Sequence, residues 1–318
     1  MQMPVSVTVD IGGTNTRVAL CQDGDVLGDT VRRFRNAEYP ALEPILDIYL
    51  ADYPLVGAIC IDMAGPVKNG IGTLTNLDWT IDAAALSVRT GGARVVVLND
   101  LQAQGHAVPH LDRDSLLTLI DGQQGPSDVR LVVNVGTGLN AVPVHSEGAL
   151  TLVPAAEAGH ITLQARNAEE LRLLNWLEAR LPSCGVEEVL SGRGLEHLHA
   201  FVCHDEGTGD PLDAAAVKDA FLAGAPQALR AARLFARYLG RYAGDLALTN
   251  LPFGGVFLVG GVAGHIGPHL MDLGFAEAFL DKGRFKPFME QFPVHLVQDD
   301  YAALRGCAAH LAELQTAT

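Results

Sequence analysis

Two short glycine turns, each set between two apolar strands, constrain the fold of this chain more than any other feature. The first lies in the run 9–14 (VDIGGT) and the second in the run 133–138 (VNVGTG). In both, a strand meets a tight turn and the chain then continues as another strand, a pattern typical of a β-hairpin. The two runs can be aligned with each other, which indicates a duplicated element and therefore two related halves.

Strands and helices are expected to alternate along the rest of the chain, which favours an α/β protein. A long helical pattern runs from about 214 to 250 and is broken near Gly224 and Pro226. The other strands are expected at residues 5–11, 17–21, 55–63, 93–100, from 130, 254–261 and 294–297. The other helices are expected at about 40–52, 167–181, 186–204 and from 302.

Length, charge and cysteine content exclude several classes of protein. The 318 residues suffice for two domains, and the apolar runs fall far short of the roughly 20 residues that a membrane span needs. The N-terminal residues do not have the pattern of a signal peptide. A net charge of −15 with scattered Lys and Arg argues against binding to nucleic acid or anionic membrane. Five cysteines without a CxxC pair fit a reducing cytoplasm.

The first glycine turn has the residues of a phosphate site. Gly12 and Gly13 let the backbone approach a phosphate and adopt positive φ, and Thr14 adds a hydroxyl donor. Successive amides in such a turn form an anion-binding nest. Asp10, at the end of the strand, is placed to hold Mg²⁺ directly or through water. The alternative is an ordinary hairpin turn.

Two further glycine elements extend this pattern. The turn Gly136-Thr137-Gly138 is the counterpart of the first in the second half, and together the two could clamp a polyphosphate. The run 254–261 (GGVFLVGG) is a buried strand bounded by glycine pairs, of which Gly260-Gly261 would let a purine lie against the backbone. Its alternative is a core strand with turn glycines.

Polar side chains with a possible catalytic role follow the apolar strand 93–98. Asp100 is well placed to accept a proton from a sugar hydroxyl as that hydroxyl attacks phosphorus. The alternative is that Asn99 and Asp100 cap a helix, because both residue types are favoured at N-caps.

Glu157, His160 and Glu187 offer groups that suit the hydroxyls of a sugar. A single histidine such as His160 is more often structural than catalytic. The cluster His197, His199, Cys203 and His204 matches no standard zinc pattern. The sequence also lacks the P-loop, the G-x-G-x-x-G fingerprint and the G-x-S-x-G elbow.

Taken together, the ordered motifs resemble those of the bacterial hexokinase-like glucokinases over essentially the whole chain. The motifs are DIGGTN, TNLDW, LND, VGTG, EAGH, VEEVLSGRGL and GGVFLVGG, followed by DKGRF at residues 281–285. The resemblance implies the two-domain actin-like ATPase (ribonuclease H-like) fold, with the active site in the interdomain cleft. It implies a small α/β domain formed by residues 1–109 and 301–318, and a large α/β domain formed by residues 110–300.

The resemblance further implies an ATP- and Mg²⁺-dependent kinase that converts glucose to glucose 6-phosphate, with Asp100 as the general base. The residues implied for sugar binding are Asn76, Asn99, Asp100, Glu157, His160 and Glu187. Those implied for the ATP phosphates and the metal are Asp10, Gly12, Gly13, Thr14, Asn15, Thr137 and Gly138, with Gly260 and Gly261 near adenosine and Asp10 as metal ligand. Family members are commonly homodimers, and no structural zinc is implied.

Three departures from the family pattern bear on activity. Asn140 follows Gly138-Leu139 where relatives have glycine, and it could narrow the nucleotide site or alter phosphate contacts. Ala158 replaces a glycine of the EAGH motif at residues 157–160, here called the sugar motif. Arg305-Gly306-Cys307-Ala308 replaces a GSGA stretch. Two alternatives therefore stay open: a kinase for another hexose, and a sugar-binding regulator that does not catalyse.

Overall fold

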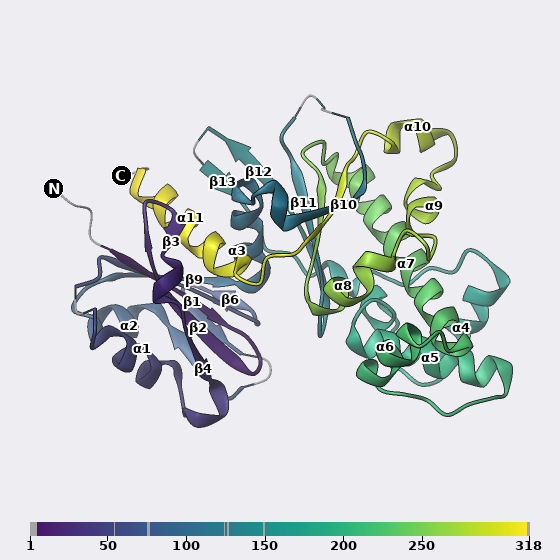
Figure 1. Ribbon diagram of the computed structural model, residues 1–318, viewed down its shortest axis with the longest axis horizontal. Helices are drawn as coiled ribbons and strands as arrows, with labels where there is room; N and C mark the ends of the chain where they lie inside the picture. Colours follow the sequence, from purple (N-terminus) through teal and green to yellow (C-terminus); the bar gives the residue numbers. More distant parts are fainter. Residues whose placement is uncertain are drawn as a thin grey trace. The chain divides into compact units, whose positions relative to one another are not determined.

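The computed structural model describes residues 5–53, 55–74, 77–123, 125, 127–148 and 150–316 (Figure 1). The chain forms two compact units. The first comprises Met1–Asp112, Val144–Ala155 and Asp299–Thr318, and the second comprises Arg113–Pro143 and Ala156–Gln298. Asn76, expected to bind the sugar, lies outside the described residues.

The first unit is built on a mixed sheet that contains the first predicted hairpin. In this sheet β1 pairs antiparallel with β2 and parallel with β5, which pairs parallel with β9. The strand order is β3-β2-β1-β5-β9, with β4 beside β2. The strands are β1 (Ser6–Ile11), β2 (Asn15–Gln22), β3 (Asp25–Val26), β4 (Arg32–Arg35), β5 (Ala58–Met63) and β9 (Arg94–Asn99). A small sheet holds β6 (Val67–Lys68), β7 (Ile71–Thr73) and β8 (Thr80–Asp82).

Helices cover both faces of this sheet, which explains why β1 and β5 are buried along nearly their whole length. On one face, Val7, Val9 and Ile61 pack with the apolar side of α1. On the other face, Cys60 and Leu98 pack with α3 and α11 (Figure 1). The helices are α1 (Leu42–Leu50), α2 (Ala83–Arg89), α3 (Asp100–Ala107) and α11 (Ala302–Thr316).

The second unit is also built on a mixed sheet, in which the strand order is β10-β15-β14-β11-β12. The chain passes from β11 through the second glycine turn into β12, which confirms the second predicted strand–turn–strand element. From Val144 onward, β12 belongs to the first unit and pairs with β13. The strands are β10 (Leu116–Ile120), β11 (Arg130–Val135), β12 (Leu139–Glu147), β13 (Leu150–Leu152), β14 (Val256–Val259) and β15 (Val294–Val297).

The helical part of the second unit packs around α7, whose buried stripe follows the spacing of an amphipathic helix. The predicted break before α7 is confirmed: α6 ends at Leu222, Gly224 adopts a φ of +79°, and Pro226 begins α7. The helices are α4 (Ala168–Glu178), α5 (Gly192–Glu206), α6 (Ala214–Leu222), α7 (Pro226–Asn250), α8 (Gly261–Ile266), α9 (Phe275–Leu280) and α10 (Lys286–Met289). In the part of the chain that the structure describes, no helix combines the length and apolar character of a membrane span.

One contact fixes the position of α3, the helix that begins at Asp100. The α11 helix crosses α3 at Gly306, where a Cβ atom would lie 1.7 Å from the carbonyl oxygen of Ala103. This glycine belongs to the stretch that departs from the family pattern, and its neighbour Arg305 forms an ion pair with Asp299 at 2.8 Å. Any larger residue at position 306 would therefore push the two helices apart.

We expect Gly306→Ala to lower the free energy of unfolding by about 3 kcal/mol or more, because the added methyl group overpacks a backbone contact. The measurement is urea unfolding followed by circular dichroism. Gly264→Ala is the matched control, since Gly264 also lies in a helix but a Cβ there would meet no atom within 4 Å. Equal stability of the two variants would show that α3 and α11 do not depend on this contact.

Candidate active site

The first glycine turn joins β1 to β2 and is closed by the Gly12 amide, which donates to the Asn15 carbonyl at 3.0 Å. Neither Gly12 nor Gly13 is among the glycines with positive φ, so that expectation is wrong. A Cβ on Gly13 would meet no atom within 4 Å, and Gly13 and Thr14 are both exposed. Glycine here leaves open space above the backbone, which is what a bound phosphate needs.

A buried asparagine that the sequence analysis did not single out supports this turn. Asn36 donates through Nδ2 to the Gly12 carbonyl at 2.7 Å, and its own amide donates to the Thr14 carbonyl at 2.9 Å. Its Oδ1 accepts from the Thr16 hydroxyl at 2.8 Å. The turn is thus held in one conformation by hydrogen bonds from a residue in a later segment of the chain.

Carboxylates from neighbouring strands gather near the carboxyl end of β1 and β5. Asp10 and Asp62 are directly paired in the β1–β5 register. Asp62 is fully buried, and its pKa is raised well above the ordinary value by burial and by the charges of Asp10 and Asp100. The only signal for Asp62 in the sequence was a polar residue within an apolar strand, and it was missed.

One oxygen of the Asp10 carboxylate already accepts a hydrogen bond from another side chain of the protein. Burial raises the pKa of Asp10, although the Arg17 guanidinium, which donates to Oδ2 at 2.9 Å, opposes that shift. Cys307 donates to Asp62 Oδ2 at 3.5 Å, while Asp62 Oδ1 makes no hydrogen bond in the described structure. Carboxylate oxygens of this kind suit Mg²⁺, so the residues fit the predicted metal, with Arg17 competing for one oxygen of Asp10.

Asn99 and Asp100 stand at the junction between β9 and α3. Asn99 is the N-cap of α3: its Oδ1 accepts from the Leu101 amide at 3.0 Å, and the Gln102 side chain completes a capping box. Its Nδ2 donates to the Gly65 carbonyl at 3.0 Å. The capping alternative is therefore confirmed for Asn99, while Asp100 occupies the first turn of the helix.

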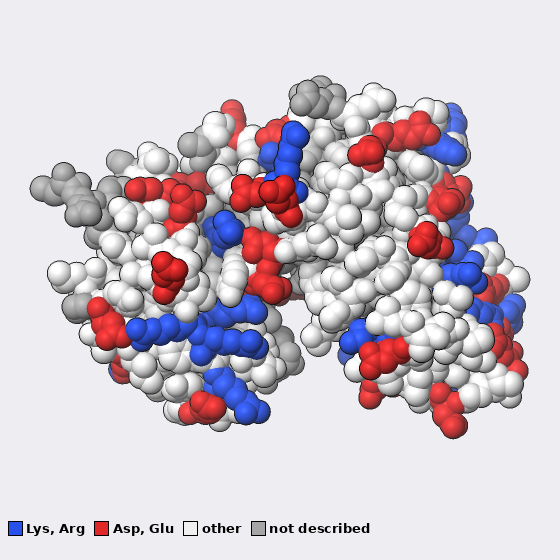
Figure 2. Space-filling model, viewed as in Figure 1, with Lys and Arg blue, Asp and Glu red and all other residues white. Residues whose placement is uncertain are grey.

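Arginines line the face of β2 and β4 beside the first turn. Arg33 is paired with Arg17 and Arg35 with Asn15 in the β2–β4 register, so these side chains share one face of the sheet. Figure 2 shows Lys and Arg side chains gathered over this part of the first unit. The expectation that basic residues are scattered is wrong here, because strand pairing brings Arg17 to Arg33 and Arg35.

In the second unit, the second glycine turn packs against the start of α5. The Gly136 amide donates to the Gly138 carbonyl at 2.9 Å, and the Gly136 carbonyl accepts from the Gly192 amide at 2.9 Å. Thr137 is exposed at the tip. Gly192, in the SGRGL motif, was not among the predicted site residues, although it lies directly beside them.

Of the predicted sugar-binding residues, Glu187 contacts this turn. Its Oε2 accepts from the Leu139 amide at 2.9 Å and would lie 2.8 Å from a Cβ on Gly138. Glu157 is the N-cap and His160 the last residue of a short 3-10 helix (Ala158–His160), and both are exposed. A Cβ on Gly159 would lie 2.0 Å from the Leu139 carbonyl oxygen, so the sugar motif rests directly on the start of β12.

Asn140 accounts for how the sugar motif is held. It lies within β12, is not among the residues with positive φ, and accepts through Oδ1 from the Ala158 amide at 2.9 Å. Its Nδ2 donates to the Ala156 carbonyl at 2.5 Å. The expectation that Asn140 narrows the nucleotide site finds no support in these bonds, because the side chain fastens residues 156–158 to the strand.

The predicted adenosine element lies beside the second turn. Gly260 adopts a φ of +99°, and a Cβ there would meet Asn134 Oδ1 at 2.3 Å, so only glycine fits. Gly261 begins α8, and a Cβ on it would meet no atom within 4 Å. The Gly261 amide lies 4.0 Å from the position of a Cβ on Gly136. Gly261 therefore leaves open backbone beside the second turn, whereas the space beside Gly260 is filled.

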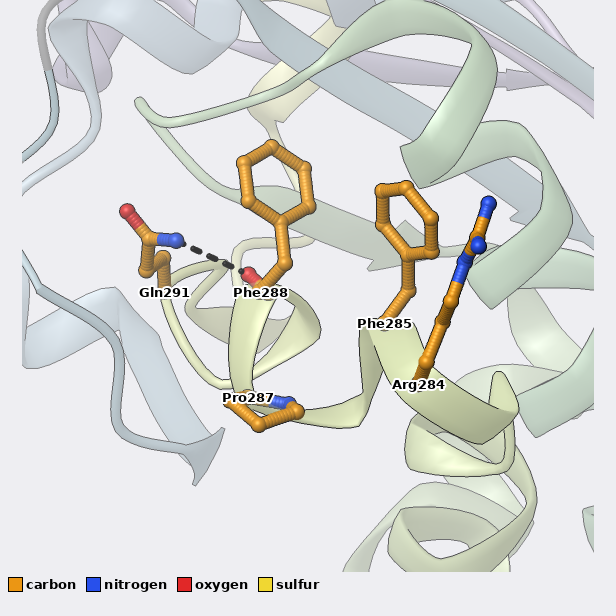
Figure 3. A pocket seen from close by; sticks show the side chains of 5 residues that line it. All are labelled: Arg284, Phe285, Pro287, Phe288 and Gln291. Atoms are coloured by element: carbon orange, nitrogen blue, oxygen red, sulfur yellow. Dashed lines mark hydrogen bonds between the residues drawn. The ribbon is translucent and has the colours of Figure 1, made fainter.

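The DKGRF motif and the histidine- and cysteine-containing segment 197–204 contribute no group to the predicted site. In the DKGRF motif, Lys282 donates to Asp245 at 2.6 Å and so ties this segment to α7. Arg284 and Phe285 line an open hollow of about 520 Å³ with Pro287, Phe288 and Gln291 (Figure 3), which contains no predicted site residue. His199 and Cys203 are neighbours at 3.7 Å, but residues 197–204 form no metal-binding group in the described structure.

The fold and these turns define an actin-like sugar kinase. A glucokinase structure from an Antarctic psychrotroph is 31% identical, with a TM-score of 0.88 over 98% of this chain and 99% of that chain. The fold of a ROK family glucokinase from Streptomyces griseus, in complex with glucose and AMPPNP, matches with a TM-score of 0.63 at 23% identity over 98% and 99% of the chains.

Sequence comparison gives the family. The family model named Glucokinase matches residues 7–314. The glucokinase of Cronobacter sakazakii is 33% identical over 310 residues, covering 96% of each chain. This chain belongs to the glucokinase family, which confirms the resemblance and the predicted actin-like ATPase fold.

We expect Asn140→Ala to loosen the sugar motif, because it removes both side-chain bonds to residues 156–158. Hydrogen exchange measured by mass spectrometry should become faster by about tenfold in the peptide that spans these residues, which corresponds to the loss of about 1–2 kcal/mol of hydrogen bonding. His145→Ala, an exposed change on the same strand, is the control. Unchanged protection in Asn140→Ala would contradict the role given to this side chain.

Proposed function

We propose that this protein transfers the terminal phosphate of ATP to the 6-hydroxyl of glucose, with Asp100 as the general base. The position of Asp100 carries the proposal. It follows the parallel strand β9, stands on the first turn of α3, and lies near enough to Asp62 to raise that residue's pKa. A carboxylate at the end of a strand, in a member of the glucokinase family, suits removal of a proton from an attacking hydroxyl.

One set of residues is proposed to bind the phosphates and the adenosine of ATP. Gly13 and Thr14 would offer amides and a hydroxyl to phosphate, and Thr137 and Gly138 would do so in the second unit. The Gly12 amide is already bonded to the Asn15 carbonyl, so Gly12 would contribute only its small size. Asp10 would hold Mg²⁺, which when bound offsets the negative charge of the phosphates. The ATP adenosine would lie against Gly260 and Gly261, where the backbone of Gly261 is open.

The sugar would be bound by Asn99, Glu157, His160 and Glu187, together with Asp100 and Asn76. Glu157 and His160 are exposed and so accessible to a ligand. Asn99 already uses Oδ1 for the helix cap and Nδ2 for Gly65, which leaves its side chain little hydrogen-bonding capacity for a sugar. Sugar hydroxyls can donate to carboxylates, and they can both donate to and accept from side-chain amides and imidazole.

We further propose a cytoplasmic homodimer. The five cysteines are all unpaired, and four of them are buried, as expected in a reducing compartment. Sedimentation velocity of the purified protein would test the dimer, since a single species at the mass of one chain would exclude it.

We expect Asp100→Asn to lower kcat by about 10²–10⁴-fold while glucose still binds, because the amide cannot accept the proton. The assay is ADP release from Mg-ATP in the presence of glucose, with glucose binding followed by calorimetry. Asp29→Asn, at an exposed position on the first unit, is the matched control. Near-normal turnover in Asp100→Asn would remove Asp100 from the role of base.

The same assay separates the alternatives. A clear preference for mannose, fructose or glucosamine would replace glucose as the substrate. Glucose binding without ADP release in the unaltered protein would favour a regulator. The bonds made by Asn140 weaken one motive for that alternative, since this departure from the family pattern has a structural use.

A further inference from the structure

A cluster of two histidines and a glutamate joins α3 to α11 within the first unit. His106 lies near the end of α3, and His310 and Glu313 lie one turn apart on α11. Glu313 Oε2 is 3.5 Å from His106 Nδ1 and 3.9 Å from His310 Nδ1. One possible ligand atom from each residue lies within 4.8 Å of the others, and no other such group occurs among the described residues.

His106 is buried and His310 and Glu313 are partly buried, yet polar atoms of all three have no hydrogen-bond partner. The side chains of His106 and Glu313 are 5% and 10% exposed. Nδ1 of His106, Nδ1 of His310 and Oε1 of Glu313 make no hydrogen bond in the described structure, and 3.5 Å is long for a good one. Buried polar groups without partners cost free energy, and a bound cation would remove that cost by taking these atoms as ligands.

We propose that His106, His310 and Glu313 form a binding site for a divalent transition metal, with Zn²⁺ as the first choice. Two imidazole nitrogens and one carboxylate oxygen are donors that Zn²⁺ accepts. Bonds of about 2.0–2.1 Å in a tetrahedral site put neighbouring ligand atoms about 3.3 Å apart, so the observed distances require only small side-chain rotations. A water molecule would take the fourth position.

The choice of metal follows from the donors. Mg²⁺ and Ca²⁺ prefer oxygen ligands in larger numbers than one carboxylate supplies. Burial is the main cause, and the nearby His106 a smaller one, of the lowering of the His310 pKa to about 4. This imidazole is therefore neutral and able to act as a ligand. The Thr151 amide donates to Glu313 Oε2 at 3.4 Å and would orient the carboxylate as an outer partner.

Two features oppose the site. The positive charge of Arg94 acts on His310 and would repel a cation. An ion pair between His106 and Glu313 would satisfy part of the cluster without a metal. Against both stands the geometry, because an ion pair between His106 and Glu313 leaves His310 Nδ1 without a partner, whereas a metal uses all three groups.

A bound metal would join the two helices that pack at Gly306. His106 lies six residues after Asp100 on α3, or about 9 Å along the helix axis. The metal would therefore hold the carboxyl end of α3 against α11. Zinc should also raise the unfolding temperature of the protein, because it binds the folded state.

The test is titration of the metal-free full-length protein with ZnCl₂ by calorimetry, without ATP or glucose, so that its outcome is independent of the proposed kinase activity. We expect one site per chain. We expect His106→Gln, His310→Gln and Glu313→Gln each to weaken zinc affinity by about 100-fold or more. The matched controls are His110→Gln and Glu147→Gln, which alter exposed residues and should change the affinity less than about twofold.

Unfolding temperatures without metal establish that each variant folds, and His310→Gln is the mildest change because its side chain is 18% exposed. Zinc should then raise the unfolding temperature of the unaltered protein and of the controls only. Co²⁺ gives an independent spectrum, in which thiolate charge-transfer absorption would reveal binding by a cysteine instead. Such absorption, equal zinc affinity in the three variants, or no saturable site would each overturn the proposal.

Discussion

The close contact between Gly306 and Ala103 is the constraint on which the first unit depends. It brings α11, from the end of the chain, against α3 and against the face of β1 and β5 that α1 does not cover. Two positions follow from it. Asp100 is held at the start of α3, and His106 is brought to His310 and Glu313. The proposed base and the proposed metal site are therefore consequences of the same helix packing, although their residues lie far apart in sequence.

For three glycines in the site motifs of the second unit, close approach of neighbouring atoms explains the residue type better than positive φ does. Gly159 admits the Leu139 carbonyl, Gly138 admits the Glu187 carboxylate, and Gly260 admits the Asn134 side chain, with positive φ at Gly260 alone. Gly13 and Gly261 differ from these three because nothing fills the space beside them. The first group makes the turns compact, and the second leaves open backbone for a ligand. A glycine-rich motif thus contains residues with separate purposes that only the structure distinguishes.

Local patterns predicted the hairpins, the order of strands and helices, and the break before α7, because each depends on neighbouring residues. Long-range partners could not be predicted in this way. Asp62 matters because strand register places it beside Asp10, and Asn36 because a loop returns to the first turn. His106 and His310 come from distant segments, and neither stands out within its own helix. The hydrogen bonds of Asn140 could not be predicted for the same reason, since its partners are sixteen and eighteen residues away.

A protein with a net charge of −15 repels an anion such as ATP, and local groups near the first turn offset this repulsion. Arg17, Arg33 and Arg35 share a face beside the first turn, while the turn itself offers amides that carry no formal charge. Burial raises the pKa of Asp62 and of Asp10 near the same strand ends, and Arg17 forms an ion pair with Asp10. An anion at the first turn would therefore meet a less negative field than the net charge suggests, because salt largely screens exposed charges that lie more than about 10 Å away.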